Sequence, residues 1–109
     1  MKLAISTENN QVAGHFGRCA EYTIAEIIDN EVISKETIEN PGHQPGFLPG
    51  FLADKGVNCI ISGGMGRKAA NLFAESNIET VVGVKGNIDN VIDKFLSNDL
   101  DASNDLCDH

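Results

Sequence analysis

A glycine-rich corner in the middle of the chain constrains the fold most. A short apolar run at residues 59–62 leads into three glycines around Met65, and helix-forming residues begin at Arg67. This order predicts a buried strand, a tight turn and a helix. Because glycine has no Cβ, a ligand can approach main-chain N–H groups where that helix begins. The corner is therefore either an anion-binding turn or a plain strand-to-helix turn.

The rest of the chain predicts an α/β domain with a mixed five-stranded sheet and helices on both of its faces. Strands are expected at residues 2–6, 21–28, 31–38, 57–62 and 79–82. Helices are expected at residues 48–55, 67–75 and 88–95. The order is β-β-β-α-β-α-β-α. The second and third strands should form a hairpin, and the last two should be parallel neighbours, because such crossovers are right-handed.

Length and charge narrow the class of protein. We expect one folded domain at residues 1–98 and an acidic flexible tail at residues 99–109. The net charge is −8 and the eight Lys and Arg residues are scattered, which argues against nucleic acid as a partner. No apolar run approaches the roughly 20 residues of a membrane span, and no secretory signal is visible. These features favour a cytoplasmic protein that does not bind membranes.

Three cysteines with no repeating spacing favour reduced thiols over a disulfide framework. No Cys-x-x-Cys pair and no pair of histidines at helical spacing is present, so a closed zinc site is poorly supported. Cys59 lies in a predicted buried strand, where packing explains it best.

The other two cysteines and the three histidines can each be interpreted with or without a bound metal. His15 and Cys19 lie on one glycine-rich loop, either as a pair of soft metal ligands or as an exposed histidine and a packed thiol. His43 lies on a Pro-Gly loop, where a lone histidine is usually solvated. Cys107 and His109 can chelate a soft metal, or they are incidental residues of the acidic end.

A catalytic function finds little support. The chain has no Gly-x-Ser-x-Gly elbow and no thiol at a predicted helix N-terminus, so we expect a protein that is not an enzyme. Residues 64–69 match Gly-x-Gly-x-x-Ala, but the acidic residue that would hold a ribose does not follow the next strand. An anion near the corner, supported by Arg67 or Lys68, stays open.

Three segments together carry a family resemblance. With the run His15-Phe16-Gly17-Arg18-Cys19, the loop that contains His43, and Gly63-Gly64-Met65-Gly66 before an alanine-rich helix, the sequence resembles the dinitrogenase iron-molybdenum cofactor biosynthesis family over nearly all of its length. The resemblance implies a ribonuclease-H-like three-layer fold without nuclease chemistry. It also implies carriage of an iron–sulfur or molybdenum-containing cluster, with metal-cluster donor and acceptor proteins as partners.

Carried over by position, the resemblance gives a set of site residues. Cofactor contacts are expected from Phe16, Arg18, Gly63, Gly64, Met65, Gly66 and Arg67. By the resemblance, metal ligands are expected among His15, Cys19 and His43, and Cys107 and His109 are added from their own chemistry as a soft pair in the acidic tail. An anionic cluster would be favoured by main-chain N–H groups and nearby cations, while thiolate or imidazole supplies any direct bond.

The leading hypothesis is therefore non-enzymatic cluster binding or transfer. One alternative is a small-molecule or anion-binding regulatory module that uses the Gly63–Gly66 loop. Another is an interaction domain with a metal-binding tail. The sequence leaves the oligomeric state open, a monomer included.

Overall fold

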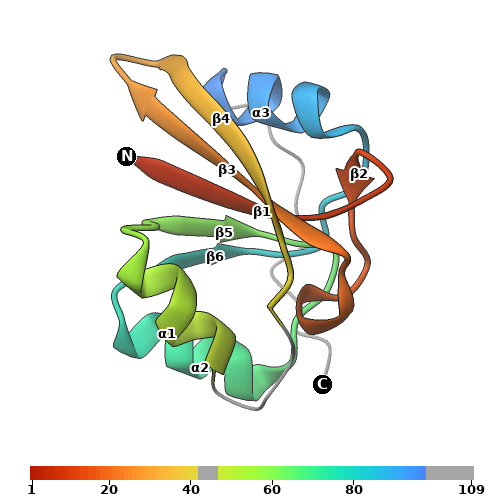
Figure 1. The fold of residues 1–109 in the computed structure, drawn as a ribbon, viewed down its shortest axis with the longest axis vertical. Helices are drawn as coiled ribbons and strands as arrows, with labels where there is room; N and C mark the ends of the chain where they lie inside the picture. The colour runs from red at the N-terminus through yellow and green to blue at the C-terminus, as the bar shows by residue number, and fades with distance from the viewer. Residues whose placement is uncertain (42–46, 98–109) are drawn as a thin grey trace.

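A mixed sheet forms the middle layer of the domain (Figure 1). The computed structural model describes residues 1–41 and 47–97. The strands are β1 (Lys2–Glu8), β2 (Gln11–Val12), β3 (Glu21–Ile28), β4 (Glu31–Glu39), β5 (Cys59–Ile61) and β6 (Glu79–Val81). Their order in the sheet is β4-β3-β1-β5-β6, with β2 paired to β1. The sheet is mixed because β1 runs antiparallel to β3 and parallel to β5.

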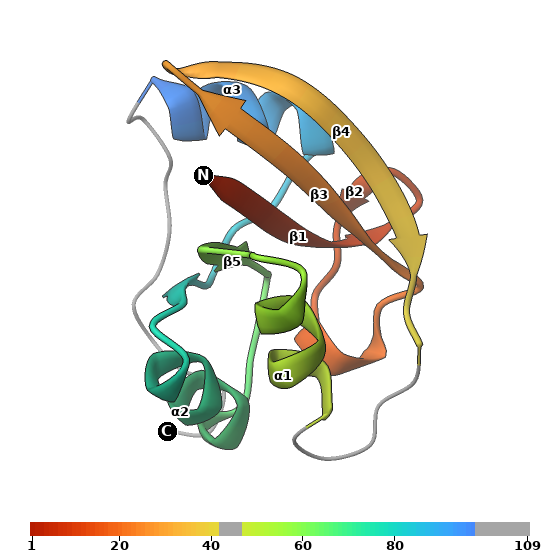
Figure 2. The same cartoon turned by 60° about the vertical axis from the view of Figure 1, so that its left-hand side comes forward.

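Helices cover both faces of this sheet. They are α1 (Phe47–Asp54), α2 (Arg67–Glu75) and α3 (Ile88–Leu96), and a 3-10 helix spans Phe16–Arg18. Figures 1 and 2 show α1 and α2 on one side of the strands and α3 on the other. Alternate residues of a strand point to opposite faces. Accordingly, Ala4 belongs to the core that contains Leu52 of α1 and Phe73 of α2, whereas Leu3 and Ile5 belong to the core that contains α3.

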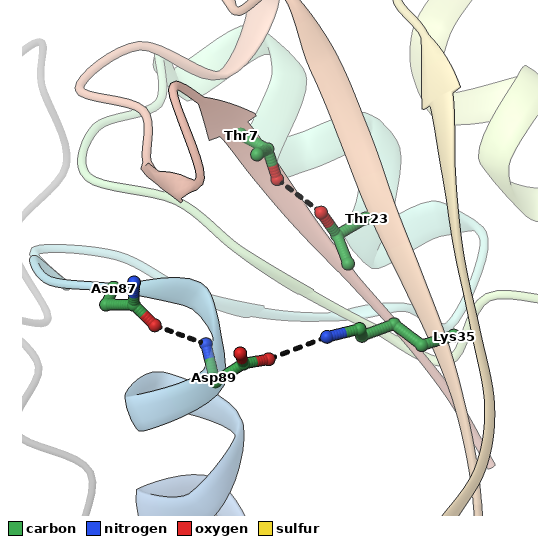
Figure 3. Close-up of polar contacts among 5 residues, drawn as sticks. All are labelled: Thr7, Thr23, Lys35, Asn87 and Asp89. Carbon is green, nitrogen blue, oxygen red and sulfur yellow. Dashed lines mark hydrogen bonds and ion pairs between the residues drawn. The ribbon is translucent and has the colours of Figure 1, made fainter.

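Local sequence features explain the turn between β3 and β4 and the start of α3. Asp29 and Asn30 have φ of 52° and 66° and join β3 to β4, as tight hairpin turns require. The Asn87 side chain accepts a hydrogen bond from the Asp89 N–H (2.9 Å) and caps α3. Figure 3 shows this cap beside the 2.6 Å ion pair between Lys35 and Asp89. That pair is exposed and contributes little to stability.

The mixed α/β class with three helices is confirmed, but the strands differ in detail from the prediction. The sheet has six strands rather than five. The extra strand is β2, which the sequence placed in a long loop. Asn9 and Asn10 adopt φ of 52° and 63°, so the chain reverses there and β2 pairs with the end of β1. β1 is also longer than predicted, because its pairing with β3 continues to Thr7.

Two expectations concern membranes and the end of the chain. Within residues 1–41 and 47–97, no helix is both long and apolar enough to cross a membrane. The tail predicted for residues 99–109 lies outside the described residues, so its flexibility stays a prediction.

Cys59 confirms the packing interpretation. It begins β5, is fully buried and belongs to the core beneath α3. Its thiol lies 3.8 Å from Oε1 of Glu79. Burial, with a smaller effect of the Glu79 carboxylate, raises the pKa of the Cys59 thiol to about 12. The neutral thiol is therefore the form that the fold accommodates.

This shift predicts weaker folding in alkali. The unfolded chain loses the Cys59 proton near pH 8.5, whereas the folded protein keeps it up to about pH 12. The free energy of unfolding should therefore fall between these two pH values, by up to about 1.4 kcal/mol per pH unit from this thiol. Urea unfolding at pH 7.5 and pH 10 measures the fall, which should be shallower in Cys59→Ala. Equal falls in both proteins would contradict the prediction.

Candidate functional site

Two loops that the sequence singled out meet at one edge of the sheet. The histidine loop (residues 13–19) connects β2 to β3 and contains the 3-10 helix, and the glycine loop (residues 63–66) connects β5 to α2. Because β1 and β5 are parallel, their carboxyl ends lie at the same edge. Figure 1 shows the 3-10 helix beside the segment that leads from β5 into α2.

Main-chain hydrogen bonds join the two loops directly. The Phe16 N–H donates to the Gly64 carbonyl and the Gly63 N–H donates to the Ala13 carbonyl, both at 2.9 Å. A Cβ placed on Gly63 would lie 2.9 Å from both Ala13 O and Gly14 Cα. Real Cβ atoms almost never approach backbone so closely. The close approach of the loops thus requires glycine at position 63.

The apolar side chains of the two loops point into the core. Phe16 is buried and its ring lies 5.1 Å from that of Phe73, edge to face, and 5.6 Å from that of Tyr22. Met65 is buried in the same core. Among the predicted cofactor contacts, Phe16 and Met65 therefore support the loops from below with their side chains.

Polar side chains also hold the histidine loop. Tyr22 Oη and Cys19 Sγ both donate to the Phe16 carbonyl, at 2.8 Å and 3.3 Å. Asn40 Nδ2 donates to the Cys19 carbonyl at 2.8 Å and to the Gly17 carbonyl at 3.3 Å. Tyr22 was not predicted to belong to this site, because a tyrosine within a strand is usually explained by packing. The loop conformation is thus held by Tyr22 of β3, by Cys19 of the loop itself and by Asn40, the residue after β4.

Cys19 lies inside the protein rather than on the loop surface. Its side chain is 4% exposed, and burial raises the pKa of its thiol. Burial likewise holds the pKa of Tyr22 well above its usual range. This placement matches the packed-thiol alternative of the sequence. To bind a metal as thiolate, Cys19 would have to leave its hydrogen bond to Phe16 O, so its role as a ligand stays a prediction.

The charged and imidazole groups of the site face solvent. His15 and Arg18 are exposed on either side of Phe16 and Gly17. Gly66 is the N-cap of α2, and Arg67 and Lys68 are exposed in its first turn. The first N–H groups of a helix have no acceptor within that helix and attract anions. The joined loops therefore carry an exposed imidazole, exposed cations and a helix N-terminus.

Three predicted ligands fall outside this description. His43, Cys107 and His109 do not belong to residues 1–41 and 47–97, which the structure describes. Within those two ranges, no group of three His, Cys, Asp or Glu side chains could hold a metal ion. The described side chains thus give one exposed imidazole, one buried thiol and the buried thioether of Met65 as soft donors at the joined loops.

Comparison with known proteins identifies the family. Residues 1–98 match the family model described as dinitrogenase iron-molybdenum cofactor. The chain belongs to this family. Protein MJ0580 of Methanocaldococcus jannaschii is 37% identical over 106 residues, which cover 93% of this chain and 90% of that protein. The resemblance inferred from the histidine and glycine loops is therefore confirmed.

Two solved structures have the same fold as this chain. The crystal structure of PH0822 has a TM-score of 0.91 and 32% identity to this chain, and the match covers both chains completely. The apo form of the orange protein of Desulfovibrio gigas has a TM-score of 0.79 and 19% identity, over 94% of this chain and 92% of that one. At that identity the second likeness concerns the fold alone. Both solved structures thus share the mixed α/β architecture of this chain.

Proposed function

We propose that this family member binds an iron–sulfur or molybdenum-containing cluster where the histidine and glycine loops meet, and carries it between donor and acceptor proteins without catalysing a reaction. The observation that carries the proposal is the pair of main-chain hydrogen bonds between the loops, Phe16 N–H to Gly64 O and Gly63 N–H to Ala13 O. They bring together the two segments that the family resemblance assigns to cofactor binding.

The donor set suits an anionic cargo that brings its own sulfide ligands. His15 can supply one direct bond, and Cys19 a second if its thiol turns outward. Arg18 and the N-terminus of α2 with Arg67 can offset negative charge. Because Phe16 and Met65 are buried, their side chains would support the loops beneath the cargo rather than touch it. So few direct ligands suit a carrier, which must release what it holds.

Several finer expectations belong to this proposal. They are the ribonuclease-H-like, three-layer description of the fold, a cytoplasmic location, a domain boundary near residue 98, and ligand roles for His43, Cys107 and His109. Each is implied by the sequence or by the family resemblance, and the domain boundary is also supported by a family model that ends at residue 98.

A second candidate function is an anion-binding regulatory module. The observation that favours it is the start of α2, where Gly66 is the N-cap and Arg67 and Lys68 are exposed. Inorganic phosphate and nucleotides are the probes for this alternative. A rise in Tm with either probe, in a protein that takes up no metal cluster, would favour it over cluster carriage.

Anaerobic reconstitution tests the leading proposal. The protein is incubated with ferrous iron and sulfide, or separately with tetrathiomolybdate, and then freed of excess reagent by gel filtration. We expect a coloured protein that retains metal. Arg18→Ala should weaken uptake about tenfold or more, because hydrogen bonds to charged groups contribute roughly 1.5–3 kcal/mol. His15→Ala should weaken uptake at least as much, because it removes a direct metal ligand.

Two controls sharpen this experiment. Lys94→Ala removes an exposed cation from α3, on the other face of the sheet, and should leave uptake unchanged. Deletion of residues 105–109 shows whether the cluster binds at the loops or in the tail. A colourless wild-type protein, or uptake that depends on the tail and not on His15, would contradict the proposal.

A further inference from the structure

A chain of buried hydroxyl groups lies beneath the two loops. Among the described residues, the buried polar side chains are Ser6, Thr7, Thr23 and Ser62. Ser6 Oγ donates to Ser62 Oγ at 2.8 Å, and Ser62 Oγ donates to the Gly64 carbonyl at 3.0 Å. Ser6 lies near the carboxyl end of β1, and Ser62 follows β5, the parallel neighbour of β1, and directly precedes the glycine loop. The two hydroxyl groups therefore form a hydrogen-bonded series that reaches the main chain of the glycine loop.

The series of hydrogen bonds continues into the histidine loop. The Gly64 carbonyl accepts hydrogen bonds from Ser62 Oγ and from the Phe16 N–H. The Phe16 carbonyl accepts one from Tyr22 Oη at 2.8 Å. Both main-chain polar groups of Phe16 are thus held, one by the glycine loop and one by β3. An unbroken series of contacts runs from Ser6 on β1, through both loops, to Tyr22 on β3.

We propose that Ser62 and Tyr22 are positioning residues of the cluster site. This inference rests on the proposed function. Neither side chain reaches solvent, since both are fully buried, so neither acts by touching a surface-bound cargo. They act through Gly64 and Phe16, and so they set the distance between the exposed His15 and the start of α2.

The physical advantage is preorganisation. A loop that is held in its binding conformation before the cargo arrives loses less conformational freedom on binding. Removing one hydroxyl frees one end of the series and leaves a buried carbonyl with fewer donors. The loop then samples other conformations, and binding weakens although every group that faces the cargo is still present.

The chain offers a matched control. Thr23 pairs with Thr7 through hydroxyl groups 2.7 Å apart, shown in Figure 3. Thr23 stands opposite Ile5 in the sheet register, and Ile5 belongs to the core beneath α3. Thr23→Val therefore removes one buried hydroxyl of similar geometry without breaking the series that holds the loops.

The experiment compares Tyr22→Phe, Ser62→Ala and Thr23→Val by titration with tetrathiomolybdate, by visible circular dichroism of the bound species, and by Tm. We expect about tenfold weaker binding and an altered dichroism spectrum for Tyr22→Phe and Ser62→Ala. Thr23→Val should lower Tm by a similar amount and change the affinity less than twofold. Weakening by Thr23→Val as large as by the other two variants, or no weakening by those two, would overturn the inference.

Amide hydrogen exchange of the unliganded protein tests how firmly the loops are held, independently of whether a cluster binds. The Phe16 N–H should exchange at least tenfold faster in Tyr22→Phe and Ser62→Ala than in Thr23→Val. Should the wild-type protein bind no tetrathiomolybdate and no iron–sulfur cluster, the proposed function fails, and the Phe16 exchange rate alone decides. Faster exchange then supports the positioning role, and unchanged exchange overturns it.

Discussion

Gly63→Ala is expected to abolish cluster binding and to lower the free energy of unfolding by about 2–4 kcal/mol, the combined cost of overpacking and lost hydrogen bonds. The added Cβ would lie 2.9 Å from both Ala13 O and Gly14 Cα. Both are backbone atoms, so no side chain can rotate away. The loops must separate, which breaks the Gly63 N–H bond to Ala13 O. Urea unfolding and a tetrathiomolybdate titration measure the two effects.

Gly14→Ala is the control for this prediction. Gly14 lies opposite Gly63 in the same contact, yet a Cβ on Gly14 meets no atom within 4 Å. This variant should stay within about 0.5 kcal/mol of the wild-type stability, as surface substitutions usually do. A Gly63→Ala protein as stable as Gly14→Ala would show that the loops do not touch in solution as the structure has them.

Phe73→Ala is expected to have the largest effect on stability, about 3–5 kcal/mol. Phe73 is fully buried on α2 and meets the Phe16 ring edge to face at 5.1 Å. Its removal leaves a cavity directly beneath the histidine loop. Binding should therefore weaken as well, even at a low temperature where the variant remains folded. Equilibrium unfolding and the same titration measure both effects.

Leu72→Ala is the control that distinguishes a general weakening of α2 from the effect of the cavity. Leu72 is the preceding residue of α2 and is only partly buried, so its truncation should cost clearly less. Equal losses in Leu72→Ala and Phe73→Ala would mean that Phe73 only supports α2. The account also fails if folded Phe73→Ala binds tetrathiomolybdate as tightly as the wild type.

Elements with strong local signals were predictable from the sequence. The helix α2 spans Arg67–Glu75, as predicted, because three glycines mark where it begins. The hairpin between β3 and β4 followed from Asp29 and Asn30, which tolerate positive φ. β2 was missed because it has two residues and depends on distant partners, such as the bond from Val12 N–H to the Gly86 carbonyl. No local pattern reports such a contact.

The two loops that form the candidate site were predictable from the sequence, but the residues that hold these loops in place were not. The histidine and glycine loops stood out by their glycines and by the family resemblance. Tyr22 and Ser62 did not, because their partners are main-chain carbonyls that only the folded protein places. One signal was available: Ser6 and Ser62 each follow an apolar run, and polar residues at the ends of parallel strands lie near ligand sites in open α/β sheets. The exposure of a loop cysteine could not be predicted either, and Cys19 is buried.

The most direct test of cluster binding at the histidine and glycine loops is to map the bound cluster on the protein by NMR. Amide spectra are recorded anaerobically for the protein before and after loading with tetrathiomolybdate, which avoids the line broadening of iron. The account predicts shifts concentrated at residues 13–19 and 63–69, with α3 unchanged. Shifts confined to residues 98–109, or a spectrum unchanged throughout, would contradict it.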